Sequence, residues 1–158
     1  MALGMSIGIL IGKHLGAKDF ERAVDEDRKL VFFSVVVGVI MGALLASFSS
    51  LFPQIYNTTD EAKEVARRFM LITACMMPIY SFQNACYFTL RSGGKTLITF
   101  FYDSVFICVA NFPVAFLLVK LTTLPVWIIF ICVCGMDVMK SVFGFVLLKK
   151  WIWLNQLV

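Results

Sequence analysis

Charged side chains are scarce in this sequence, and long stretches have none. Asp, Glu, Lys and Arg make up 15% of the 158 residues, against about 25% in a typical soluble domain, and the mean hydropathy is +0.88. No charged residue lies between Lys29 and Asp60, or between Arg68 and Arg91. Because a helix needs about 20 mostly apolar residues to cross a bilayer, this pattern excludes a soluble globular protein and indicates a membrane protein.

The charge-poor stretches predict four complete membrane spans and part of another. They are expected at about 30–53, 66–90, 96–119 and 124–148, with residues 1–12 as the last half of a fifth span. Unpaired backbone groups are costly in lipid, so each span is expected to be an α-helix and the fold class to be an all-α membrane protein. The first residues lack a basic segment and a small-residue cleavage site, so no signal peptide is expected.

Histidine and cysteine give no sign of metal or catalytic chemistry. His14 is the only histidine and stands in a polar segment. The five cysteines all fall inside predicted spans, and Cys132 and Cys134 lack the spacing of a zinc site. In "LRSGGKT" (Leu90–Thr96) a phosphate-binding loop would need a glycine at Thr89. We therefore predict no enzyme activity, no metal and no organic cofactor.

Lys and Arg are distributed unevenly between the two sides of the predicted bundle. If the spans alternate in direction, ten of the fourteen lie on the side of the 12–29 segment, the 91–95 turn and the C-terminal end. The positive-inside rule places this side in the cytoplasm, and the loops at 54–65 and 120–124 outside. The net charge of +4 then reflects topology and predicts no nucleic-acid partner. Three tryptophans near span ends are expected to be interface anchors: Trp127, Trp151 and Trp153.

Glycine recurs every fourth residue at the start of the chain. Gly4, Gly8, Gly12 and Gly16 form one stripe of a helix. Stripes of small residues let membrane helices approach closely, so we expect a packing face. The stripe alone does not distinguish static packing from a seam that slides during transport.

Two charged segments predict helix starts on either side of the first full span. "GAKDFERAVDEDRKL" is expected to be a short surface helix that Asp19 caps, with Phe20 and Val24 touching the membrane. "TTDE" (Thr58–Glu61) is a capping-box pattern, expected to open the helix that enters the next span.

Polar side chains inside the predicted spans are the candidate functional residues, since ionisable groups at membrane depth are costly and usually functional. The candidates for cation or substrate binding are Asp103, Asp137, Tyr80, Gln83, Asn84 and Asn111. Pro78 and Pro113 remove helical hydrogen bonds and mark bend points.

A structural role is the alternative for each of these residues. The amides then hold helices together. Asp103 pairs with Arg91 or Lys95 near a span end, and Asp137 pairs with Lys140, three residues further along the same helix.

Five segments in order resemble the multidrug and toxic compound extrusion (MATE) transporters. "GKHLGAKDFERA" resembles the family's G-x-x-L-G-A-x-D-x-x-x-A elbow, and "TLRSGGKT" resembles its L-R-G-x-G-x-T turn, with Ser92 in place of the first glycine. The other three segments are "LFPQIYNTTDEAKEVARRFM", "NFPVAFLL" and the final "KKWIW". Some sodium-coupled members carry an acid in the helix before the turn, but here that helix, Phe69–Leu90, has none.

The resemblance implies a twelve-helix transporter of two six-helix lobes, of which this chain is the C-terminal lobe from the end of its second helix. It implies export of organic, often cationic drugs or toxins in exchange for Na⁺ or H⁺, by alternating access. The implied partners are the lipid bilayer and a missing N-terminal lobe or another chain. The implied location is the bacterial inner membrane, with a cytoplasmic C terminus.

Two other functions stay open on the sequence. One is a lipid-linked oligosaccharide flippase of the same wider superfamily. Such proteins usually line a cationic cavity, and the fact that Lys140 is the only basic residue inside a predicted span argues against this function. The other is a non-transporting membrane subunit that only packs against a partner.

Overall fold

The chain is helical throughout its described part, and the predicted all-α fold class is confirmed. The computed structural model describes residues 2–55, 57–122, 125–151 and 153–154, and no strand occurs in these ranges. The elements in chain order are α1 (Ala2–Gly16), α2 (Phe20–Phe48), α3 (Phe52–Ile55), α4 (Asp60–Ser92), α5 (Thr96–Phe100), the π-helical segments η1 (Phe101–Val105) and η2 (Ile107–Asn111), α6 (Phe112–Leu121) and α7 (Val126–Lys149).

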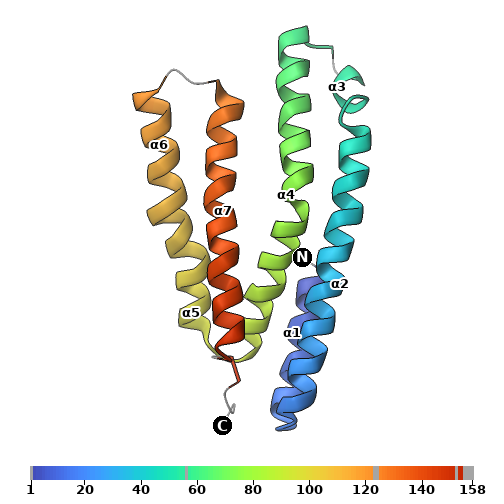
Figure 1. Cartoon of the computed structure of the whole chain (residues 1–158), viewed down its shortest axis with the longest axis vertical. Helices are drawn as coiled ribbons and strands as arrows, with labels where there is room; N and C mark the ends of the chain where they lie inside the picture. The colour runs from blue at the N-terminus through green and yellow to red at the C-terminus, as the bar shows by residue number, and fades with distance from the viewer. Residues whose placement is uncertain (1, 56, 123–124, 152, 155–158) are drawn as a thin grey trace.

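Two groups of helices form the bundle (Figure 1). In the first, α2 and α4 run side by side and α1 lies along the lower half of α2. The second consists of α5, α6 and α7, and the lower half of α4 leans toward α7. α4 contains Pro78, which removes a backbone hydrogen bond and permits a bend. The two groups therefore meet near the α4–α5 turn and diverge toward the other end.

In the described part of the chain, three helical stretches are long and apolar enough to cross a bilayer by length and composition: Phe20–Phe48, Thr96–Leu121 and Val126–Lys149. α4 spans 33 residues and contains the predicted 66–90 span, yet it is not among them. Its middle carries Tyr80, Gln83 and Asn84, which lower its hydropathy. The chain is an integral membrane protein, and the count of four complete spans stays a prediction.

The charged elbow is not a separate surface helix as expected. Residues 20–29 are the first turns of α2, which continues to Phe48; no glycine or proline lies between Phe20 and Val37 to separate the elbow from the span. Asp19 caps this helix as predicted, since its carboxylate accepts the backbone N–H of Arg22 at 3.3 Å. α2 also ends before the predicted boundary at residue 53.

A buried apolar cluster lies where α1, α2, α4 and the C-terminal segment meet. Its members are Ile7, Ile11, Leu15, Ala23, Ala85, Leu90 and Trp153. Phe20 and Val24 are partly buried and pack against this cluster, and their contact with the membrane stays a prediction. Trp153 is 1% exposed and is a core residue, not an interface anchor. Its carbonyl lies against Gly93, where any side chain would collide with it.

α4 begins where the sequence predicted, but without the predicted capping box. The helix starts at Asp60, and its N-cap residue is Thr59. Thr59 makes no side-chain capping hydrogen bond, so the acidic first turn, Asp60 and Glu61, is the favourable feature of this helix end.

The closest approach of a helical glycine to the backbone of another helix involves a different glycine pair from the predicted stripe. Gly4 and Gly8 do face Phe88 of α4, but a side chain at Gly12 or Gly16 would meet nothing within 4 Å. In α2, a Cβ at Gly42 would lie 2.5 Å from the carbonyl oxygen of Ala74, in the backbone of α4. Gly38, one turn earlier, faces Ser81 and Pro78 in the same way. Gly38 and Gly42 therefore set the close approach of α2 to α4.

We predict that Gly42→Ala lowers the stability of the protein, because a methyl group there collides with backbone that cannot rotate away. Overpacking of this kind costs about 1–3 kcal/mol. The measurement is the apparent melting temperature in detergent, with Gly12→Ala as the matched control. Equal melting temperatures for the two variants would contradict the assignment of Gly42 to the α2–α4 contact.

Candidate functional site

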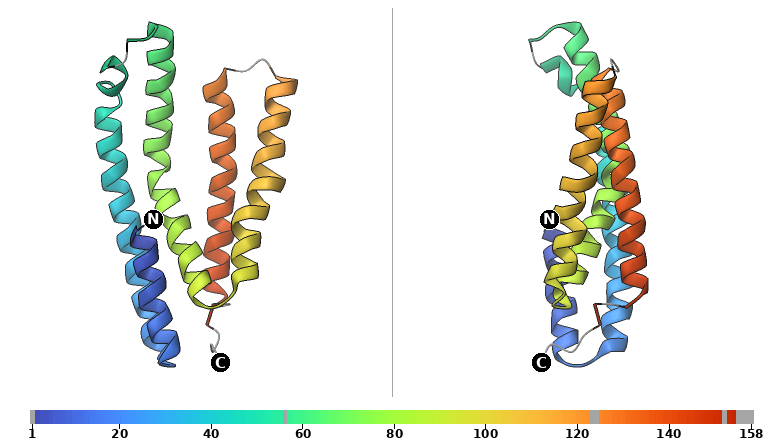
Figure 2. Two further views of the ribbon diagram at one scale, coloured as in Figure 1. Left: turned by 180° about the vertical axis from the view of Figure 1, so that it is seen from behind. Right: turned by 90° about the vertical axis from the view of Figure 1, so that its left-hand side faces the viewer.

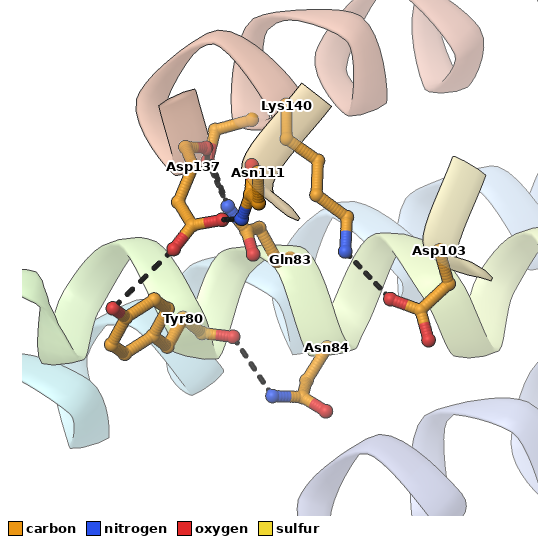
Figure 3. A network of polar contacts seen from close by, with 8 residues as sticks. Tyr80, Gln83, Asn84, Asp103, Asn111, Asp137 and Lys140 are labelled. Carbon is orange, nitrogen blue, oxygen red and sulfur yellow. Dashed lines mark hydrogen bonds and ion pairs between the residues drawn. The ribbon is translucent and has the colours of Figure 1, made fainter. Parts of the chain in front are cut away.

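The polar residues predicted from the spans gather between the two helix groups (Figure 3). α4 contributes Tyr80 and Gln83, η2 contributes Asn111, and α7 contributes Asp137 near its middle. The lean of α4 toward α7 is what brings the polar side of α4 against Asp137.

Asp137 is the centre of this network. Its Oδ1 accepts Nδ2 of Asn111 at 3.0 Å, and its Oδ2 accepts the hydroxyl of Tyr80 at 3.5 Å. Gln83 donates Nε2 to the backbone carbonyl of Asp137 at 2.6 Å and to the hydroxyl of Ser141 at 3.0 Å. Within the described part of the chain, Asp137 makes hydrogen bonds with neutral donors and no ion pair.

Asp103 forms a separate ion pair with Lys140. The Nζ of Lys140 lies 2.6 Å from Oδ1 of Asp103 and 5.1 Å from the ring centroid of Tyr102. The Lys140 side chain is 7% exposed and that of Asp103 is 46% exposed, so the acid faces open space and the base is buried.

The two pairings expected under the structural alternative are both wrong. Asp103 pairs with Lys140 rather than with Arg91 or Lys95, and Lys140 does not pair with Asp137. Lys140 extends along the helix toward η1, while Asp137 is already occupied by donors from α4 and η2 (Figure 3). The i, i+3 spacing of Asp137 and Lys140 within α7 therefore does not determine the ion-pair partner of Lys140.

A cleft of about 390 Å³ adjoins the ion pair. It is lined by Met5, Gln83, Asn84, Tyr87, Phe88, Arg91, Tyr102, Asp103 and Lys140. Asn84 lies on this side and donates to the carbonyl of Tyr80, in its own helix, at 2.9 Å. The predicted residues thus form two neighbouring clusters: Tyr80, Gln83, Asn111 and Asp137 in one, and Asn84 and Asp103 in the other.

Two buried polar atoms at these clusters lack a hydrogen-bond partner among the described residues. They are Oδ1 of Asn111 and the hydroxyl of Tyr102. Tyr102 fits against α7 because Gly144 has no side chain; a Cβ there would lie 2.6 Å from the tyrosine oxygen. Unpaired oxygen atoms beside a carboxylate are potential ligands for a hard cation. Among the described residues, no group of three or more His, Cys, Asp and Glu side chains is placed to hold a metal ion.

The sequence reasoning missed several polar residues of the bundle. Ser141 follows Asp137 by one helical turn, a spacing that could have identified it. Lys140 was expected beside Asp137, and its partner Asp103 was not predicted. Asp27 of α2 is 5% exposed and accepts a hydrogen bond of 2.6 Å from Thr89 of α4. The pairing of Asp27 with Thr89 spans 62 positions in the chain and has no local signal.

This all-helical bundle with acids at membrane depth belongs to the MatE family, whose match covers residues 1–117. The family is the one that the sequence motifs resemble.

Among curated proteins, the chain is similar to "Probable multidrug resistance protein YoeA" of Bacillus subtilis (strain 168). The two are 25% identical over 131 residues, which cover 81% of this chain and 28% of the relative. The chain thus spans under a third of that relative's length. No solved structure matched the chain.

We predict that Asp103→Asn destabilises the protein more than Lys140→Met does. The first change leaves a buried ammonium unpaired, whereas the second leaves a half-exposed carboxylate that water can reach. Breaking a fully buried pair costs about 3–5 kcal/mol, and the partial exposure of Asp103 reduces this to about 1–3 kcal/mol. Melting temperatures in detergent measure both variants and the double variant, which is expected to recover part of the loss. A more stable Asp103→Asn than Lys140→Met would contradict the burial argument.

Proposed function

We propose that this chain forms most of one lobe of an efflux transporter that exports organic, often cationic compounds in exchange for Na⁺ or H⁺. Membership of the MatE family and similarity to a protein named for multidrug resistance support a transport role. The observation that carries the proposal is the carboxylate of Asp137, held at mid-helix by neutral donors from α4 and η2.

Binding of a cation at Asp137 would change the contacts between the two helix groups. A proton on the carboxylate, or Na⁺ beside it, competes with the hydrogen bonds from Tyr80 and Asn111. Those bonds join α4 to α7 and η2 to α7, so their loss or exchange favours a different arrangement of the helices. Alternating access needs this kind of link between ion binding and helix position.

The cleft beside Asp103 is the proposed place for the exported compound. Asp103 offers a half-exposed carboxylate, and Tyr87, Phe88 and Tyr102 offer aromatic surface. Organic cations bind carboxylates and the faces of aromatic rings. Because Lys140 already pairs with Asp103, an incoming cation would compete with Lys140 for the carboxylate.

The same ion pair favours a drug transporter over an oligosaccharide flippase. A flippase of this superfamily is expected to line its cavity with positive charge. Lys140 is paired with Asp103 at 2.6 Å, so Arg91 is the lining residue that brings positive charge to the cleft outside an ion pair in the described part of the chain.

The remaining parts of the proposal concern partners and location. The second wall of the transport cavity comes from a missing N-terminal lobe or another chain, and the bilayer of the bacterial inner membrane surrounds both. Na⁺ or H⁺ is the coupling ion and no other cofactor is proposed.

Asp137→Asn is expected to reduce export in a complete two-lobe transporter that contains this chain. It removes a charged hydrogen-bond acceptor worth about 1.5–3 kcal/mol per bond, which predicts a loss of about tenfold or more. The measurement is efflux of a fluorescent organic cation from cells, at matched protein level. Asp103→Asn is measured beside it, and Ser141→Ala is the control that removes a neutral hydroxyl from the same network.

Export at the parental rate by both aspartate variants would mean that neither acid couples transport. No export by the parent two-lobe protein would instead favour a non-transporting subunit.

We also predict that the loop at 57–59 faces outward and that the α1–α2 turn faces the cytoplasm. Thr58→Cys and Lys18→Cys are introduced separately after the native cysteines have been replaced by serine. A membrane-impermeant maleimide added to intact cells is expected to label position 58 and not position 18. Labelling of position 58 only after the cells are opened would reverse the topology.

A further inference from the structure

A groove of about 470 Å³ runs between α2 and α7, on a different face of the bundle from the candidate site. Figure 2 shows the two faces: in its right-hand view α2 and α7 lie toward one side, and α1 and α5 toward the other. Phe82 of α4 contributes to the lining between the two helices. The walls are apolar and include Val31, Phe32, Val35, Phe145 and Leu148. This volume lies within the range of about 300–1,000 Å³ that is usual for ligand pockets.

One end of the groove carries positive charge. Arg28 and Lys149 line it, and neither makes an ion pair in the described part of the chain. Arg28 lies 5.5 Å from the ring centroid of Trp151, which also lines the groove. These groups stand at the level where the apolar stretches end: Arg28 just precedes the charge-free part of α2, and Lys149 is the last residue of α7.

Asp27 is the acid that lines this groove, and its carboxylate is occupied. It is 5% exposed, and its Oδ1 accepts the Thr89 hydroxyl at 2.6 Å, in the contact between α2 and α4. A neutral hydroxyl leaves the charge of the Asp27 carboxylate in place, so the lining holds two basic groups and one buried acid, an excess of positive charge.

We propose that this groove binds an anionic phospholipid of the surrounding membrane. The phosphate faces Arg28 and Lys149, and one acyl chain lies along Val31, Val35 and Phe145. A free phosphate would leave the apolar walls uncovered, and an apolar helix would leave both basic groups unpaired. A phospholipid matches both ends, at the depth where its headgroup lies in the bilayer. The proposal does not depend on the proposed transport function.

Native mass spectrometry of the full chain in detergent tests the proposal. The chain is titrated separately with phosphatidylglycerol, with phosphatidylcholine and with soluble glycerol phosphate, and the dissociation constant of the first bound molecule is measured. Phosphatidylglycerol is expected to bind most tightly, at one saturable site. In Arg28→Gln/Lys149→Gln its affinity is expected to fall about fivefold for each basic group removed.

The control, Lys13→Gln/Lys18→Gln, removes the same charge from the same end of the bundle but outside the groove. It is expected to keep the parental affinity. Val35→Trp fills the apolar part and keeps both basic groups; it is expected to weaken binding, with helix content checked by circular dichroism.

Three results would overturn the proposal. One is that the parent chain binds phosphatidylglycerol and phosphatidylcholine equally tightly, or binds neither lipid. Another is an equal loss of affinity in the two double variants. The third is binding of glycerol phosphate as tight as that of phosphatidylglycerol, which would mean a phosphate site without a lipid.

Discussion

The hydrogen-bonded carboxylate of Asp137 is the constraint around which the bundle is arranged. A carboxylate at mid-helix in a membrane chain is costly unless donors surround it. Those donors are Tyr80 and Asn111, which belong to different helices. Because Gln83 also bonds the carbonyl of Asp137, α4 is held to α7 at two levels. The lean of α4 past Pro78 and the contact between the two helix groups follow from this requirement (Figure 1).

The helix between α4 and α7 is adapted to the same constraint. Its two π-helical segments, η1 and η2, carry Asp103 and Asn111. A π-helical turn is wider than an α-turn and often occurs at functional sites, because it changes the direction of side chains without ending the helix. Here both side chains reach α7, at Lys140 and Asp137. Pro113 follows two residues after η2, inside the continuous helical stretch Thr96–Leu121, where it removes a backbone donor.

Sequence predicted what depends on local pattern and missed what depends on packing between helices. The apolar stretches predicted most helix positions to within about six residues, but α2 runs from Phe20 to Phe48 where the expected span was 30–53. Asp19 was correctly predicted as a cap from its neighbours. The candidate polar residues were predicted by type and depth, but their pairing was not. Lys140 was assigned to Asp137 by proximity in sequence, whereas its long side chain reaches Asp103, 37 positions away. In the regular stripe from Gly4 to Gly16, Gly4 meets the Phe88 side chain closely, whereas Gly42 of α2 meets the backbone of α4.

The two acids differ in a way that decides which is the better candidate for coupling. Asp103 already has a cation, Lys140, so binding another one there must displace an ion pair. Asp137 has only neutral donors in the described chain, and its negative charge is therefore uncompensated. A proton or Na⁺ at Asp137 removes that charge without breaking an existing ion pair, and the unpaired Oδ1 of Asn111 lies beside it. Asp103 is better suited to a compound that brings its own positive charge and aromatic contacts, since the cleft around it is partly open and lined by aromatic rings.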